Sequence, residues 1–147
     1  LIAGHGPLYS QINSQLLELK INVKLLGHVP RSDALKLINS SDLVIIPSRH
    51  EGFGIVALEA FITNTPCVGF NIPGLKNIFR CNENLLADYL SITDIASKSV
   101  SILNNKEHID FSRYASEYNI SNTITQEKNL YLALTTQTHA GIATSAI

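Results

Sequence analysis

The chain has 147 residues, enough for one domain, and an ordinary globular composition with 45% hydrophobic and 16% charged residues. A net charge of −1 provides no basic surface for nucleic acid, and no apolar run reaches the roughly 18 residues of a transmembrane span. Cys67 and Cys81 show neither metal-ligand spacing nor a disulfide framework. We expect a cytoplasmic protein without a nucleic-acid partner or a metal, reaching a membrane only through some further part of a longer parent.

Apolar runs and helical patterns alternate along the first half of the chain. Pro7 suits the first position of a helix, and Ser32 is a candidate N-cap. The run "DLVIIP" contains three consecutive β-branched residues, Val44 to Ile46, as in a strand buried on both faces of a parallel sheet. In chain order, the expected strands are 1–4, 22–27, 42–47 and 66–70, and the expected helices are about 7–20, 32–40 and 55–64.

The second half of the chain has weaker patterns. Residues 77–90, "NIFRCNENLLADYL", are compatible with one or two short strands. Helical spacing follows at 93–104, 106–118 and 121–136. The alternation predicts an α/β domain, with a Rossmann-like parallel sheet flanked by helices and further helices at the C-terminus.

The opening "LIAGHGP" resembles the end of a buried strand and has no initial methionine. We therefore expect residues 1–136 to form an N-terminally truncated domain, and residues 137–147 to be a poorly ordered tail. The expected strands lead into three loops, 4–7, 27–31 and 47–54. Because ligands of such sheets bind beyond the carboxyl ends of the strands, we expect a crevice where these loops gather.

The third loop, in "RHEGFGIVALEA", carries the clearest signal. Gly52 and Gly54 allow the backbone to approach a ligand closely. A helix that begins near Ile55 directs its free N–H groups and the positive end of its dipole toward the same crevice. This arrangement favours an anion, and phosphate in particular.

Two glutamates belong to the same stretch. Glu59, one turn inside the helix, leans toward the helix N-terminus and can accept two hydrogen bonds from a ribose diol. Glu51 would meet the hydroxyl groups of a sugar. Ordinary alternatives remain open at this point: Glu51 as a solvated loop residue, Glu59 on an exposed helix face, and the glycines as plain turn residues. The residues alone indicate a phosphate or nucleotide crevice and specify no reaction.

The stretch 42–74, "DLVIIPSRHEGFGIVALEAFITNTPCVGFNIPG", resembles the donor-binding half of retaining glycosyltransferases with the GT-B fold, the glycosyltransferase family 4 group. This stretch shares three features with that family: a strand ending in Pro-Ser, a Glu-Gly-Phe-Gly loop, and a second glutamate at the E-x7-E spacing. "AGHGP" and "LLGHVP" are similar to two further loops of that family, and the resemblance covers residues 1 to about 104.

This resemblance implies a role for each matched residue. Glu51 would contact the donor sugar closest to the chemistry, and Glu59 would bind the ribose. The diphosphate and the donor sugar would be bound by Gly52, Phe53, Gly54 and Ile55. The base would lie beside the loop formed by Gly27, His28 and Val29.

The resemblance also implies a reaction: transfer of a sugar from a nucleotide diphosphate sugar, with retention, to a saccharide or lipid-linked acceptor. The acceptor would be bound by a missing N-terminal domain. Neither a cofactor nor an essential metal is expected, because the helix end and basic side chains would stabilise the leaving-group charge.

Two other classes of protein share some of these features. A non-catalytic or degenerate module that binds a nucleoside diphosphate would share the same residues without turnover. A dehydrogenase domain is disfavoured, because the Gly-x-Gly at Gly4 lacks a third glycine and no acidic residue ends the next strand.

Overall fold

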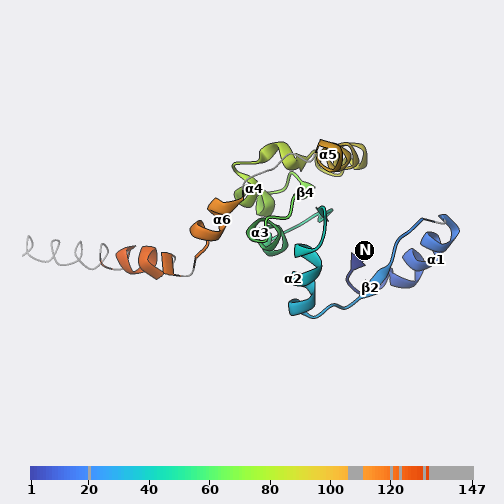
Figure 1. Ribbon diagram of the computed structural model, residues 1–147, viewed down its shortest axis with the longest axis horizontal. Helices are drawn as coiled ribbons and strands as arrows, with labels where there is room; N and C mark the ends of the chain where they lie inside the picture. Colours follow the sequence, from blue (N-terminus) through green and yellow to red (C-terminus); the bar gives the residue numbers. More distant parts are fainter. Residues whose placement is uncertain (20, 106–110, 120, 123, 131, 133–147) are drawn as a thin grey trace, which may run out of the picture. The chain divides into compact units, whose positions relative to one another are not determined.

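The computed structural model (Figure 1) describes residues 1–19, 21–105, 111–119, 121–122, 124–130 and 132. The chain divides into two compact units, 1–107 and 108–147. In the first unit, parallel strands alternate with helices that flank them. The expected α/β class with a Rossmann-like arrangement is confirmed.

The first sheet pairs β1 (Ile2–Ala3) with β2 (Leu25–Gly27) in parallel, and α1 (Tyr9–Leu19) connects them. The prediction that Pro7 begins this helix is wrong. The Tyr9 N–H donates to the Gly6 carbonyl at 3.0 Å, which closes a turn around Pro7, and the helix starts only after that turn.

The helix α2 (Arg31–Asn39) follows β2 directly. Ser32 is not its N-cap, contrary to the prediction, because it lies inside the first turn. The cap position is occupied by Pro30, whose side chain makes no capping bond. Its carbonyl instead accepts the N–H groups of Asp33 at 3.0 Å and Ala34 at 2.9 Å. An extended proline thus begins the helix through its main chain.

The second sheet is parallel, in the order β3-β4-β5, with strands β3 (Val44–Ile46), β4 (Cys67–Phe70) and β5 (Leu86–Ala87). All residues of the central β4 are buried. Burial on both faces was expected for β3 as well, but Ile45 is 50% exposed while Ile46 is buried. In the described part of the chain β3 is an edge strand, so it has a neighbour on one side only.

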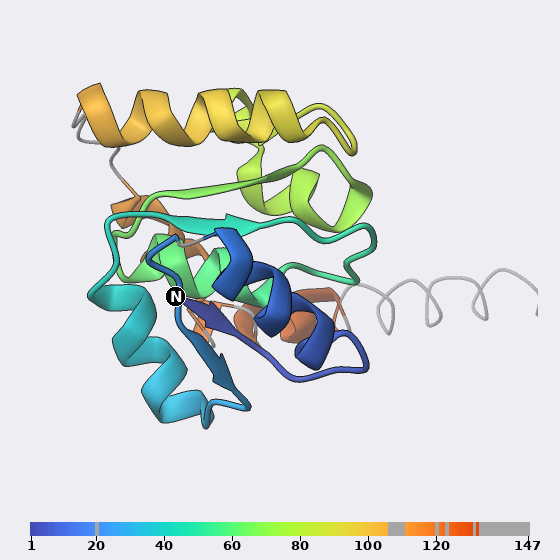
Figure 2. The same ribbon diagram turned by 90° about the vertical axis from the view of Figure 1, so that its right-hand side faces the viewer.

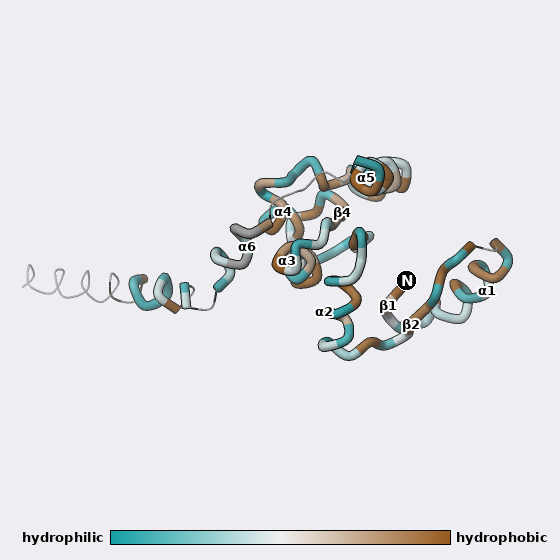
Figure 3. Tube along the Cα trace, viewed as in Figure 1, coloured by the Kyte–Doolittle hydropathy of each residue, from teal (hydrophilic) through white to brown (hydrophobic). Residues whose placement is uncertain are grey.

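The helix α3 (Ile55–Ile62) connects β3 to β4 and is almost entirely apolar, as its mainly brown trace in Figure 3 shows. Its buried face consists of Ala57, Ala60 and Phe61. The Phe61 ring packs edge-on against Phe79, with centroids 4.9 Å apart. This contact fixes the helix that follows the third loop.

The helix α4 (Pro73–Phe79) was not predicted, because residues 77–90 were expected to hold strands. A proline at its first position and apolar residues at Leu75, Ile78 and Phe79 are sufficient signals for a helix. The rest of the segment forms a short 3-10 helix (Glu83–Leu85) and β5, so a single short strand in 77–90 is confirmed.

The helix α5 (Ile92–Asn105), yellow to orange in Figure 2, confirms the expected helix 93–104 and contacts β4 and β5. In the second unit, α6 (Ser112–Glu117) lies within the expected helix 106–118, whose residues 106–110 fall outside the described ones.

Within 121–136, the described residues 121–122, 124–130 and 132 are helical, and the expected tail 137–147 is not described. Among the described residues, no helix combines the length and apolar character needed to cross a membrane.

Candidate functional site

Loops that follow successive strands meet in the first unit. The Gly4 N–H donates to the Gly27 carbonyl at 2.7 Å, so the loops after β1 and β2 are adjacent. From the start of α2, Arg31 reaches Glu59 on α3. The loop after β3 contacts α4, where Gly74 lies against Glu51. The first two predicted loops are therefore in contact with each other, while the second reaches α3 and the third packs against α4.

The helix α3 begins where the sequence predicted. Gly54 is its N-cap and has a left-handed backbone, with φ 85° and ψ 43°. The first helical bond runs from the Leu58 N–H to the Gly54 carbonyl at 3.1 Å. The N–H groups of Ile55, Val56 and Ala57 thus precede the first N–H that donates within the helix, that of Leu58, as the anion-site interpretation requires.

Packing as well as backbone conformation demands a glycine at position 54. A Cβ atom there would lie 2.8 Å from Leu75 Cδ2 and 3.3 Å from the Gly74 carbonyl oxygen. The N-terminus of α3 is therefore seated directly on the first turn of α4. A Cβ atom at position 54 would require the Leu75 side chain to move, in addition to the strain that the positive φ imposes on other residues.

Glu51 is half-buried, and its carboxylate is held locally. The Ser48 hydroxyl donates to Glu51 Oε1 at 3.2 Å, so one loop residue orients another. On the main-chain side, a Cβ atom on Gly74 would overlap the carbonyl group of Glu51. The loop is thus fixed from both directions, which favours one orientation of the acidic side chain.

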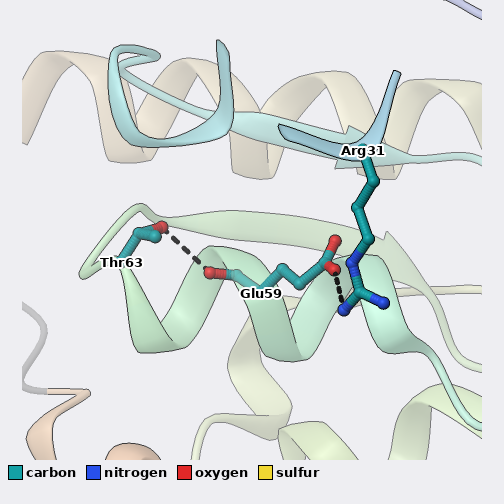
Figure 4. A network of polar contacts seen from close by, with 3 residues as sticks. All are labelled: Arg31, Glu59 and Thr63. Carbon is teal, nitrogen blue, oxygen red and sulfur yellow. Dashed lines mark hydrogen bonds and ion pairs between the residues drawn. The ribbon is translucent and has the colours of Figure 1, made fainter. Parts of the chain in front are cut away.

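Glu59 is held by an ion pair that the sequence did not reveal (Figure 4). Arg31 Nη2 donates to Glu59 Oε1 at 2.9 Å, and the side chains are 77% and 15% exposed respectively. Thr63 Oγ1 donates to the Glu59 main-chain carbonyl at 2.9 Å. The only sequence signal for Arg31 was its place as the last residue of the loop 27–31.

The residues expected to frame a base lie beside a hollow. Gly27 has a left-handed backbone with φ 66°. His28 and Val29 line a hollow of about 530 Å³, together with Pro30 and residues of α2. A smaller hollow of about 270 Å³ lies beside 4–9, where the His5 and Tyr9 rings are 5.2 Å apart. What either hollow binds stays a prediction.

The remaining predicted residues present apolar surface at the loop. Phe53 and Ile55 are 47% and 56% exposed, and Gly52 is exposed as well. A ligand seated here would meet main-chain N–H groups next to apolar side chains. Within the described ranges, no group of three or more His, Cys, Asp or Glu residues could hold a metal ion.

Comparison with known proteins defines the class. The family described as "Glycosyl transferases group 1" matches residues 1–121. The chain therefore belongs to the group 1 glycosyl transferases.

Individual relatives are similar over much of this chain. "D-inositol 3-phosphate glycosyltransferase" of Corynebacterium urealyticum is 32% identical over 127 residues, which are 82% of this chain and 30% of that protein. "N-acetyl-alpha-D-glucosaminyl L-malate synthase" of Bacillus anthracis is 27% identical over 108 residues, 73% of this chain and 28% of that protein.

"GDP-mannose-dependent alpha-(1-6)-phosphatidylinositol dimannoside mannosyltransferase" of Mycobacterium tuberculosis is 32% identical over 89 residues, 60% of this chain and 23% of that protein. The chain thus spans less than a third of the length of each of these relatives.

Proposed function

We propose that this chain is the donor-binding part of a retaining glycosyltransferase that uses a nucleotide diphosphate sugar. The observation that carries the proposal is the geometry of α3: a left-handed Gly54 opens its N-terminus, and Glu59 lies one turn inside. Membership of the group 1 glycosyl transferases supports the class of reaction. One relative is named as a GDP-mannose-dependent mannosyltransferase, which supports a nucleotide sugar as the donor.

In this proposal, the diphosphate lies at the N-terminus of α3. The N–H groups of Ile55, Val56 and Ala57 donate to phosphate oxygens, and the helix dipole adds a favourable field. Glu59 accepts hydrogen bonds from the two ribose hydroxyls. Its carboxylate is the second acid of an E-x7-E pair with Glu51.

Glu51 is the residue proposed to lie nearest to the reacting sugar. Its contact with Ser48 and the close packing of its main chain on Gly74 fix its position before the donor arrives. Transfer with retention then depends on holding donor and acceptor together, which accounts for a large share of the barrier reduction. The acceptor, a saccharide or a lipid-linked sugar, would be bound by a part of the protein outside this chain.

Calorimetric titration of the purified chain with UDP, GDP and ADP tests the proposal. A charge-assisted hydrogen bond contributes roughly 1.5–3 kcal/mol, so Glu59→Ala should weaken binding of the preferred nucleotide at least tenfold. The matched control is Glu18→Ala, which removes an exposed glutamate from another helix, α1. A folded chain that binds none of the three nucleotides at millimolar concentration would overturn the donor-site assignment.

A further inference from the structure

Arg31 approaches Glu59 from a different element and a distant part of the chain. It is the first residue of α2, and Figure 4 shows its side chain extending to the Glu59 carboxylate on α3. The two residues are 28 positions apart, and Arg31 Nη2 lies 2.9 Å from Glu59 Oε1. The ion pair therefore connects the loop after β2 to the helix after β3.

The contact uses little of the capacity of either group. An ionised carboxylate has about four acceptor positions, and a guanidinium has five N–H donors. One of each is engaged here, and among the described residues Glu59 Oε2 accepts no hydrogen bond. A diol can therefore bind the carboxylate while the arginine remains in place.

The two partners of the ion pair differ in how far their side chains are exposed to solvent. Glu59 is 15% exposed and Arg31 is 77% exposed. The glutamate is thus the confined partner, and the arginine covers it from the solvent side. A carboxylate held in this way has fewer rotamers to lose when a ligand binds, so the ligand bears less of the entropy cost.

We propose that Arg31 is a positioning residue for the nucleotide site, holding Glu59 in the orientation that accepts the ribose diol. The inference rests on the proposed function, because it assigns the ribose to Glu59. Arg31 acts through Glu59 in this account and contributes nothing to affinity once Glu59 is removed.

A double-mutant cycle of nucleotide binding tests this dependence. The affinity of the preferred nucleoside diphosphate is measured by calorimetry for the wild-type chain, Arg31→Ala, Glu59→Ala and the double variant. We expect Arg31→Ala to weaken binding about three- to fivefold, the upper part of the range for an exposed ion pair. In the Glu59→Ala background the same substitution should have no effect, and Arg31→Lys should restore part of the loss.

The matched control is Lys24→Ala, just ahead of β2. It removes the same charge from an exposed residue at the other end of that strand, away from the loop 27–31. Its affinity should equal that of the wild type, and all variants should melt at similar temperatures.

Each other outcome overturns the inference in a distinguishable way. Unchanged affinity in Arg31→Ala, with Glu59→Ala still weakened, rejects the positioning role and leaves the donor site intact. Tighter binding would show that Arg31 competes with the ribose. An equal loss in both backgrounds would show that Arg31 contacts the nucleotide directly. If the wild-type chain binds no nucleotide, both the proposed function and this inference fail.

Discussion

Gly74, the second residue of α4, lies against the main-chain carbonyl of Glu51, so close that a Cβ atom on residue 74 would overlap the carbonyl oxygen. The loop that carries Glu51, the predicted catalytic glutamate, therefore packs against the start of α4. Because the contact involves backbone on both sides, no side-chain rotation can relieve it.

Gly74→Ala should therefore destabilise the first unit and displace the loop at Glu51. Overpacking of this kind costs about 1–3 kcal/mol, which urea unfolding can measure. Gly52→Ala is the control on the same loop, since a Cβ there would meet nothing within 4 Å. Equal stability of the two variants would contradict the close contact.

Phe61→Ala should cost roughly 3–5 kcal/mol of unfolding free energy, the range for a buried aromatic residue. Phe61 of α3 is 1% exposed, and its ring packs on Phe79 of α4. Its neighbour Ile62 is 46% exposed, so Ile62→Ala should change stability by less than about 1 kcal/mol. A comparable loss in both variants would show that α3 does not bury the face described here.

Asn64 ends α3 with a left-handed backbone, φ 59°. Its N–H donates to the Phe61 carbonyl at 3.0 Å, and the next N–H, of Thr65, donates to Ala60 at 2.8 Å. Such a turn suits glycine or asparagine. We expect Asn64→Ala to lower the unfolding free energy by about 1 kcal/mol, and Asn64→Gly to preserve or raise it. The reverse order in urea unfolding would exclude this helix end.

The buried Cys67 thiol should make the stability of the chain depend on pH. Burial raises the pKa of the Cys67 thiol, whereas Cys81 is exposed. In the unfolded chain the Cys67 thiol ionises near pH ~8.5, so above that pH the unfolded state binds fewer protons than the folded one. The contribution of Cys67 to stability is complete below this pH and decreases by up to about 1.4 kcal/mol per pH unit above it.

Urea unfolding of the wild type and of Cys67→Ala at neutral and alkaline pH measures this contribution of Cys67 to the free energy of unfolding. The variant should show a smaller loss of stability between the two conditions, because other groups titrate equally in both proteins. An identical pH dependence would mean that the thiol is accessible in the folded chain.

The sequence predicted the elements around α3 well, because their signals are local. A β-branched run, paired glycines and an apolar helix made β3, the loop and the start at Ile55 predictable. The helix α4 was missed because Gly74 and Asn77 have low helix propensity and obscured an apolar spacing that was present.

The pairing of Arg31 with Glu59 could not be predicted in the same way. It depends on how α2 and α3 are brought together by the sheet, and no local pattern connects residues 28 positions apart. The same holds for the contact of Gly74 with Glu51. The sequence thus indicated which residues belong to the candidate site, while their partners required the tertiary structure.

The central claim is that a nucleotide diphosphate binds at the N-terminus of α3, and amide chemical-shift mapping by NMR tests it most directly. Titration with the preferred nucleotide should shift the amides of 54–57, 27–29 and 31 together, with one common dissociation constant. Shifts confined to the hollow beside His5 and Tyr9, or no shifts at saturating nucleotide, would contradict the assignment of the donor site.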